Sequence, residues 1–167
     1  MAISETDLRH LRRCVELARE ALDDGDEPFG SVLVSGAGSV LFEGRNRVRG
    51  GDSTRHPEFE ISRWAAANLT PEARAAAVVY TSGEHCPMCA ASHGWVGLGR
   101  IVYAVSSAQL SGWLSRWGAA PAPVAALPIT TVVPAAVVEG PVPELEDEIR
   151  SLHRACFAPG AVDASPE

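Results

Sequence analysis

The amino-acid sequence predicts an α/β fold in which helices alternate with buried strands. Apolar residues recur at helical spacing in four long segments and in short runs typical of strands in five others. In order, these are helix 8–22, strands 31–34 and 39–44, helix 57–69, strand 77–82, helix 86–98, strand 100–105, a short helical stretch 110–117, strand 129–133 and helix 144–157. Two helix–strand alternations in the middle of the chain predict right-handed crossovers and parallel pairing there.

Capping and turn residues define the expected ends of these segments. Ser4 followed by Asp7 has the pattern of a capping box for the first helix, and Asp24-Gly25 supplies its stop. A Gly36-Ala37-Gly38 turn joins the first two strands into a hairpin. Gly99 is expected to end the helix that begins near Cys86.

The segment 118–143 is expected to be mainly a connection over the surface. It holds half of the 12 prolines, which interrupt helices and sheets because they lack a backbone N–H. Strand 129–133 is the one regular element predicted within it. We expect a single domain over residues 1–157, followed by a frayed tail over residues 158–167.

Composition limits the kinds of partner. The chain has 167 residues, of which 46% are hydrophobic, so it can bury a sizeable core. It contains no lysine; its 14 arginines are outnumbered by 21 acidic residues, giving a net charge of −7. Nucleic-acid binding normally needs a basic patch that displaces counterions, so this balance argues against a polynucleotide and permits a small, uncharged ligand.

The sequence predicts a cytoplasmic protein with no membrane partner. No stretch reaches the roughly 18 apolar residues that a bilayer span needs. The first seven residues are acidic and lack the layout of a signal peptide. In a reducing compartment, four cysteines indicate metal or catalytic groups rather than disulfides. Of these, Cys14 and Cys156 lie in helical patterns and are expected to fill the core.

Two short motifs carry the chemistry: His56-Pro57-Glu58 and Cys86-Pro87-Met88-Cys89. Proline is best tolerated in the first helical turn, so each motif marks the start of a helix. Cys86 and Cys89 are three residues apart and therefore face the same side of their helix. The partial positive charge of a helix N-terminus favours the thiolate that binds a metal.

One histidine and two cysteines at neighbouring helix starts predict a three-ligand zinc site. Such sites leave the fourth position to water, which is the catalytic rather than the structural arrangement. Zinc lowers the pKa of its water to about 7, and the nearby Glu58 is suited to move that proton. Two other readings of the cysteine pair are a redox couple and a structural zinc knuckle. A structural site could be closed by His93, although a core position for His93 fits better.

These motifs resemble the zinc-dependent cytidine and nucleobase deaminases, whose signature is H-x-E followed by P-C-x-x-C. The two motifs follow the family's order, together with Pro28-Phe29-Gly30 and Gly44-Arg45-Asn46-Arg47. The residues around Asn46 and the Cys-Pro-Met-Cys motif are most similar to the guanine deaminase and tRNA adenosine deaminase branch. The resemblance implies a three-layer α/β/α sandwich around a five-stranded mixed sheet. It also implies zinc on His56, Cys86 and Cys89, Glu58 as proton shuttle, Asn46 on the base and Phe29 lining the pocket.

Three departures from the family surround the substrate. Pro57 replaces the usual alanine and cannot donate a backbone hydrogen bond. His85 replaces the proline before the first cysteine, so Pro57 and His85 join Asn46 and Phe29 as candidate substrate-binding residues. Residues 106–111 lack the acidic group that guanine deaminases carry there. The reaction type is therefore better defined than the substrate.

The sequence thus favours a zinc-dependent hydrolase that deaminates a free nucleobase or a heterocyclic analogue and releases ammonia. Guanine-like, cytosine-like and triazine-like rings all remain open, and water is the second substrate. The alternatives are a tRNA adenosine deaminase and a non-catalytic, zinc-stabilised binding module. By resemblance to the same branch, the protein is expected to form a homodimer.

Overall fold

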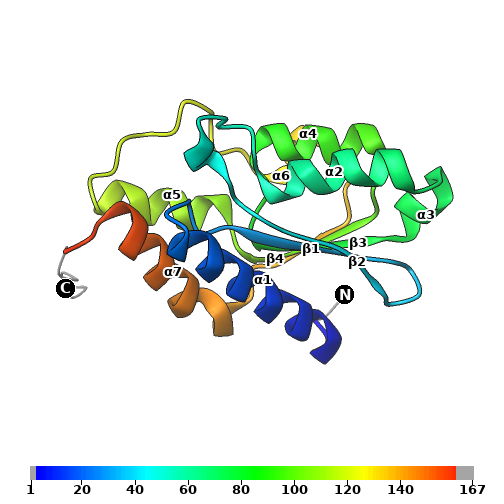
Figure 1. Ribbon diagram of the computed structural model, residues 1–167, viewed down its shortest axis with the longest axis horizontal. Coiled ribbons are helices and arrows are strands. Elements are labelled where there is room, and N and C mark those ends of the chain that lie inside the picture. Colours follow the sequence, from blue (N-terminus) through cyan, green and yellow to red (C-terminus); the bar gives the residue numbers. More distant parts are fainter. Residues whose placement is uncertain (1–2, 161–167) are drawn as a thin grey trace.

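The computed structural model describes residues 3–160 as a five-stranded mixed sheet with helices on both faces (Figure 1). The strands are β1 (Gly30–Val34), β2 (Val40–Arg45), β3 (Val78–Gly83), β4 (Arg100–Val105) and β5 (Val138–Glu139). The helices are α1 (Glu5–Asp23), α2 (Pro57–Asn68), α3 (Pro71–Ala76), α4 (Pro87–Val96), α5 (Ser107–Arg116), α6 (Ile129–Val132) and α7 (Pro143–Phe157), with a 3-10 turn at Val48–Gly50. The predicted three-layer sandwich is confirmed.

The strand order is β2-β1-β3-β4-β5. β1 pairs antiparallel with both β2 and β3, whereas β3–β4 and β4–β5 are parallel. The prediction of parallel strands joined by a crossover helix is therefore confirmed for β3, α4 and β4. In the register of β1 against β3, Ser31 lies directly opposite Thr81.

Helices cover the two faces of the sheet in separate groups. Figure 1 shows α1 and α7 side by side on one face and α2 beside α4 on the other. Val32 and Leu33 are neighbours in β1 and fully buried, but they belong to cores on opposite faces because side chains alternate along a strand. Cys14 is fully buried in the α1–α7 core as predicted, whereas Cys156 is only half-buried.

An ion-pair network fastens α1 to the sheet. Asp7 is 4% exposed and accepts hydrogen bonds from Arg100 Nη1 at 2.7 Å and Tyr80 Oη at 2.8 Å. It also completes the predicted capping box with Ser4. The Arg100 guanidinium continues to Glu139 at 2.7 Å, so one network joins α1, β3, β4 and β5.

The prediction of a strand at Ile129–Val133 is wrong. Residues 129–132 form the short helix α6, and the edge strand β5 lies further on at Val138–Glu139. The Glu84 carboxylate accepts a hydrogen bond from the Ile129 backbone N–H at 2.9 Å, and the Val133 N–H donates to the Ile129 carbonyl at 2.8 Å. These tertiary and local contacts stabilise a helical turn, although the β-branched residues of the segment favour a strand.

One further boundary and one additional helix differ from the predictions. Helix α4 ends at Val96 and is closed by Gly97 in the left-handed conformation (φ 75°), not by Gly99. A Cβ at Gly99 would lie 2.5 Å from the Ala77 carbonyl oxygen, so this glycine is required by close backbone packing. The short helix α3 was not predicted; Thr70 caps it by accepting a hydrogen bond from the Ala73 N–H.

Within residues 3–160, no helix combines the length and the apolar character needed to cross a membrane. Of the tail expected at residues 158–167, residues 161–167 lie outside the described part of the chain.

Candidate metal centre

Two helix starts on one face of the sheet bring the predicted ligands together. His56 is the N-cap of α2 and Cys86 is the N-cap of α4, each followed by a proline at the first helical position. Cys89 lies one turn into α4. Because α2 and α4 pack side by side (Figure 1), their N-terminal ends deliver the three side chains to one point.

The three ligand atoms form a nearly equilateral triangle. His56 Nδ1 lies 3.6 Å from Cys86 Sγ and 3.6 Å from Cys89 Sγ, and the two sulfurs are 3.6 Å apart. Tetrahedral zinc with sulfur at about 2.3 Å and nitrogen at about 2.0–2.1 Å separates its ligands by about 3.6–3.8 Å. The donor set and its spacing therefore fit zinc, and these residues form a candidate zinc site.

The electrostatics of the triangle also favour a cation. The pKa of Cys86 is lowered to about 4, first by its hydrogen bond with Cys89 and then by His56. The pKa of Cys89 is raised, first by the same contact with Cys86 and then by burial and the nearby Glu58 charge. Two thiolates this close repel each other, and a bound cation removes that repulsion.

Glu58 lies directly beside the triangle. Its side chain is buried, and its Oε2 is 3.8 Å from Cys89 Sγ. The other oxygen, Oε1, accepts hydrogen bonds from Thr81 Oγ1 at 2.6 Å and from Ser31 Oγ at 3.0 Å. Burial raises the pKa of Glu58, whereas the Thr81 hydrogen bond and the His56 charge oppose that rise.

The hydroxyls of Ser31 and Thr81 were not predicted as part of the site. Ser31 is the one polar side chain in the buried strand β1, and Thr81 precedes a second polar residue, Ser82, in β3, so the signal in the sequence is weak. Their meeting depends on the antiparallel register of β1 and β3, which local sequence patterns do not determine.

Asn46 offers an unused hydrogen-bond donor. Its side chain is fully buried, and its Oδ1 accepts from the Val48 N–H at 3.0 Å. Its backbone N–H donates to the Phe29 carbonyl at 3.0 Å, which joins the loop after β2 to the loop before β1. Asn46 Nδ2 is buried without a hydrogen-bond partner in the described protein, and such a group normally has one.

Phe29 and Pro57 both pack against neighbouring residues. The Phe29 ring meets His153 of α7 edge-on, with ring centroids 4.9 Å apart, and also lies against Gly83. His153 is fully buried. Pro57 is buried at the first position of α2, near Gly44 of β2.

His85, which precedes Cys86, and His93, which lies one turn after Cys89 in α4, form a buried pair. Their rings meet edge-on with centroids 5.4 Å apart, and the Nδ1 atoms of both lack a partner among the described residues. Burial lowers the pKa of His85 well below its usual value, so its ring is neutral. His93 Nε2 lies 2.9 Å from the Gly99 carbonyl oxygen, and the metal-ligand cluster found in residues 3–160 does not include His93.

Two glutamates near the site were not assigned functions from the sequence. Glu27 is half-buried, and its charge is one of the smaller causes that raise the pKa of His56, after the hydrogen bond with Cys86. Glu84 accepts hydrogen bonds from the backbone N–H groups of Ser107 and Ile129, so it ties the starts of α5 and α6 together. It lines a cavity of about 310 Å³ that includes none of the triangle residues.

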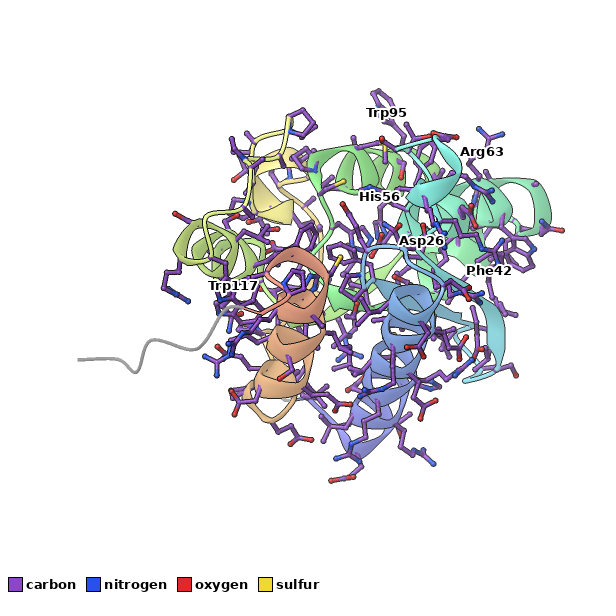
Figure 2. All side chains as sticks on the ribbon, turned by 60° about the vertical axis from the view of Figure 1, so that its left-hand side comes forward. Asp26, Phe42, His56, Arg63, Trp95 and Trp117 are labelled. Carbon is purple, nitrogen blue, oxygen red and sulfur yellow. The ribbon has the colours of Figure 1, made fainter. Side chains whose placement is uncertain are left out.

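Exposed side chains contrast with these buried groups. His56 is half-buried. Figure 2 shows the Trp95 ring projecting from the outer surface of α4. Trp95 is 91% exposed. Trp113 of α5 is 3% exposed and lies in the α1–α7 core, with Trp117 packed against the same cluster.

The five-stranded sandwich and its His/Cys/Cys triangle define a metal-binding α/β protein. Residues 4–105 match the family described as the cytidine and deoxycytidylate deaminase zinc-binding region. This match covers more than half of the chain, and the chain belongs to that family.

Relatives in the family carry different substrate names. The chain is 32% identical over 122 residues to a probable cytosine deaminase of Schizosaccharomyces pombe, covering 71% of this chain and 72% of that protein. It is 31% identical over 115 residues to a tRNA-specific adenosine deaminase of Haemophilus influenzae, covering 68% and 66%. The solved structure of guanine deaminase from Bacillus subtilis is 30% identical with a TM-score of 0.55, covering 72% of this chain and 82% of that one.

Proposed function

We propose that this protein is a zinc-dependent hydrolase that deaminates a free nucleobase or a heterocyclic analogue. The observation that carries the proposal is the buried Glu58 carboxylate, whose Oε2 lies 3.8 Å from a sulfur of the three-ligand set. A three-ligand zinc set leaves a coordination position open, and an adjacent carboxylate is suited to proton transfer. A purely structural zinc module needs neither feature.

The proposed reaction needs metal binding and proton transfer, and different residues perform these two tasks. When bound, zinc lowers the pKa of a water molecule to about 7 and so supplies a nucleophile at neutral pH. His56, Cys86 and Cys89 hold the metal. Glu58 takes a proton from the attacking water and passes it to a ring nitrogen. It then transfers the remaining proton of the added hydroxyl group to the amino group, which leaves as ammonia. The exocyclic C–N bond breaks, a C=O bond replaces it, and ammonia is released.

Four residues are proposed to orient the ring. The unused Nδ2 of Asn46 donates a hydrogen bond to an acceptor on the base. Phe29 presents a half-buried aromatic ring to the same region, and His85 contributes a neutral imidazole beside Cys86. Pro57 is placed next to the ring at the start of α2 and has no backbone N–H to donate to it. An acceptor next to the reacting carbon is common to guanine-like, cytosine-like and triazine-like rings.

The charge of the protein favours a free base over tRNA. The chain has no lysine and a net charge of −7, whereas a polynucleotide partner requires many phosphate contacts. A tRNA-specific relative makes this alternative worth a direct test. Filter binding to tRNA from 50 to 300 mM salt should detect no steep dependence of affinity on salt. A steep slope with micromolar binding would favour the tRNA reaction instead.

The proposed catalytic domain spans residues 1–157. The proposed assembly of this domain is a homodimer. The 91% exposed Trp95 on α4 provides a large apolar side chain for such an interface. Light scattering coupled to size exclusion measures the mass directly, and a Trp95→Glu variant should shift a dimer toward the monomer.

The activity is tested by ammonia release from a panel of purines, pyrimidines, nucleosides and triazines. We expect release from at least one free base, and loss of turnover by about 10²–10⁴-fold in Glu58→Ala with zinc retained. Wild-type rates in Glu58→Ala would exclude the mechanism. Absence of ammonia from every compound, with one zinc per chain bound, would favour the non-catalytic module.

A further inference from the structure

Two buried hydroxyls converge on one oxygen of Glu58. Ser31 of β1 and Thr81 of β3 face each other across the antiparallel pair, and both are 0% exposed. Thr81 Oγ1 is 2.6 Å and Ser31 Oγ is 3.0 Å from Glu58 Oε1, and the two hydroxyl oxygens are 3.0 Å apart. Oε2 of the same carboxyl group is directed toward the metal-ligand sulfur of Cys89.

We propose that Ser31 and Thr81 are positioning residues that hold Oε1 of Glu58, so that Oε2 is the oxygen that carries the proton during deamination. This inference rests on the proposed function. It assigns distinct tasks to the two oxygens of one carboxyl group, and it makes the β1–β3 register part of the catalytic apparatus.

The donors can serve Oε1 in more than one arrangement. A hydroxyl has one proton, and Thr81 can donate it either to Glu58 Oε1 or to the Gly83 carbonyl oxygen, 2.9 Å away. Ser31 can donate to Glu58 Oε1 or to Thr81 Oγ1. When Thr81 turns to Gly83, Ser31 can still supply a hydrogen bond to Oε1. Oε1 therefore loses both donors only when Thr81 turns to Gly83 and Ser31 turns to Thr81 at the same time.

This anchor suits a group that gains and loses a proton. The last torsion of a glutamate side chain is broad and roughly two-fold, so packing alone distinguishes its two oxygens poorly. A proton that moves from water to Oε2 leaves Oε1 as a carbonyl oxygen, which still accepts from either hydroxyl. When Oε2 passes the proton to the substrate, the carboxylate returns to its starting state with the same hydrogen bonds.

The kinetic test removes each hydroxyl in turn from the zinc-loaded full-length enzyme. In Thr81→Val and Ser31→Ala we expect kcat to fall about 10–100-fold, the range typical of groups that orient metal-site residues, with little change in KM and one zinc per chain. Thr81→Ser keeps the hydroxyl and should restore most of kcat. The control is Ser62→Ala, because the buried Ser62 hydroxyl donates to the Glu58 backbone carbonyl, contacts the Ser92 hydroxyl and, among residues 3–160, makes no hydrogen bond to the Glu58 carboxyl group.

A structural readout keeps the inference separate from the proposed function. Crystal structures of zinc-loaded wild type and of the Thr81→Val and Ser31→Ala variants should show the Glu58 carboxyl group rotated in the variants only. If the wild type deaminates no compound, the proposed function fails, yet this rotation still tests the anchor. An unrotated Glu58 in these variants would overturn the inference. Full kcat in the Ser31→Ala/Thr81→Val double variant would also overturn it. If Thr81→Val does not fold, Ser31→Ala carries the test.

Discussion

Cys86 and Cys89 place their sulfur atoms 3.6 Å apart, and His56 Nδ1 lies 3.6 Å from each. Two thiolates this close, one of them fully buried, would repel each other, and a bound cation would remove that repulsion. The spacing and the chemistry of the three side chains therefore both fit a cation of the size and preference of zinc.

Loss of one sulfur ligand should remove the metal. Cys89→Ser replaces a soft ligand with a hydroxyl, and we expect zinc content by elemental analysis to fall well below one per chain. Because metal binding is coupled to folding, Tm should fall as well. Cys156→Ser is the matched control, since Cys156 is half-buried and outside the triangle. Equal zinc in the two variants would contradict the assignment.

The Asn46 amide should contribute to substrate binding through Nδ2 alone. Asn46→Asp keeps the oxygen that accepts from Val48 but removes the unused donor. Loss of one such hydrogen bond costs about 1–3 kcal/mol, or roughly 5- to 150-fold in kcat/KM. Zinc content should not change. Asn68→Asp, at an exposed position on α2, controls for the added charge. Unaltered kcat/KM in Asn46→Asp would exclude this contact.

Gly30 is required by the close approach of α1 to β1. A Cβ at this position would lie 2.5 Å from Leu17 Cβ and would also meet the Cys14 carbonyl oxygen. Gly30→Ala should therefore lower the free energy of unfolding by about 1–3 kcal/mol, measured by urea denaturation. In Gly112→Ala the nearest atom is 3.6 Å away in an α-helix, so stability should rise by up to about 1 kcal/mol. Equal effects would show that crowding is not the cause.

Asp7 should stabilise the fold in a pH-dependent manner. Burial alone would raise the pKa of Asp7, but hydrogen bonds from Arg100, Ser4 and Tyr80 together hold it well below its usual range. A depressed folded-state pKa contributes stability that is fully present above the unfolded value of about 4 and is lost as the pH falls through the folded value.

Asp7→Asn should accordingly lower the free energy of unfolding by about 1.5–3 kcal/mol at pH 7, the usual worth of hydrogen bonds to a charged group. The difference from wild type should shrink as the pH drops below about 4. Asp23→Asn, at the exposed end of α1, serves as control and should show no such convergence. A difference that stays constant across this range would mean that the Asp7 charge is not responsible.

The helix starts at the site are determined by local chemistry, and the sequence predicts them correctly. Pro57 and Pro87 each begin a helix, because proline fits the first turn, and so the ligands before them become N-caps. The strand predicted at residues 129–133 is wrong, although β-branched residues there favour a strand. A hydrogen bond from Ile129 to Glu84, 45 residues away along the chain, helps to form a helix there instead.

The spacing of two motifs at helix starts is enough to predict the candidate metal ligands and the neighbouring carboxylate, because this spacing needs no long-range information. How that carboxylate is held depends on contacts between strands that are distant in the sequence. Ser31 and Thr81 are 50 residues apart, and they reach Glu58 together because β1 pairs antiparallel with β3 in one particular register. Strand register depends on the packing of whole faces, and for that reason no local pattern in the sequence predicts it.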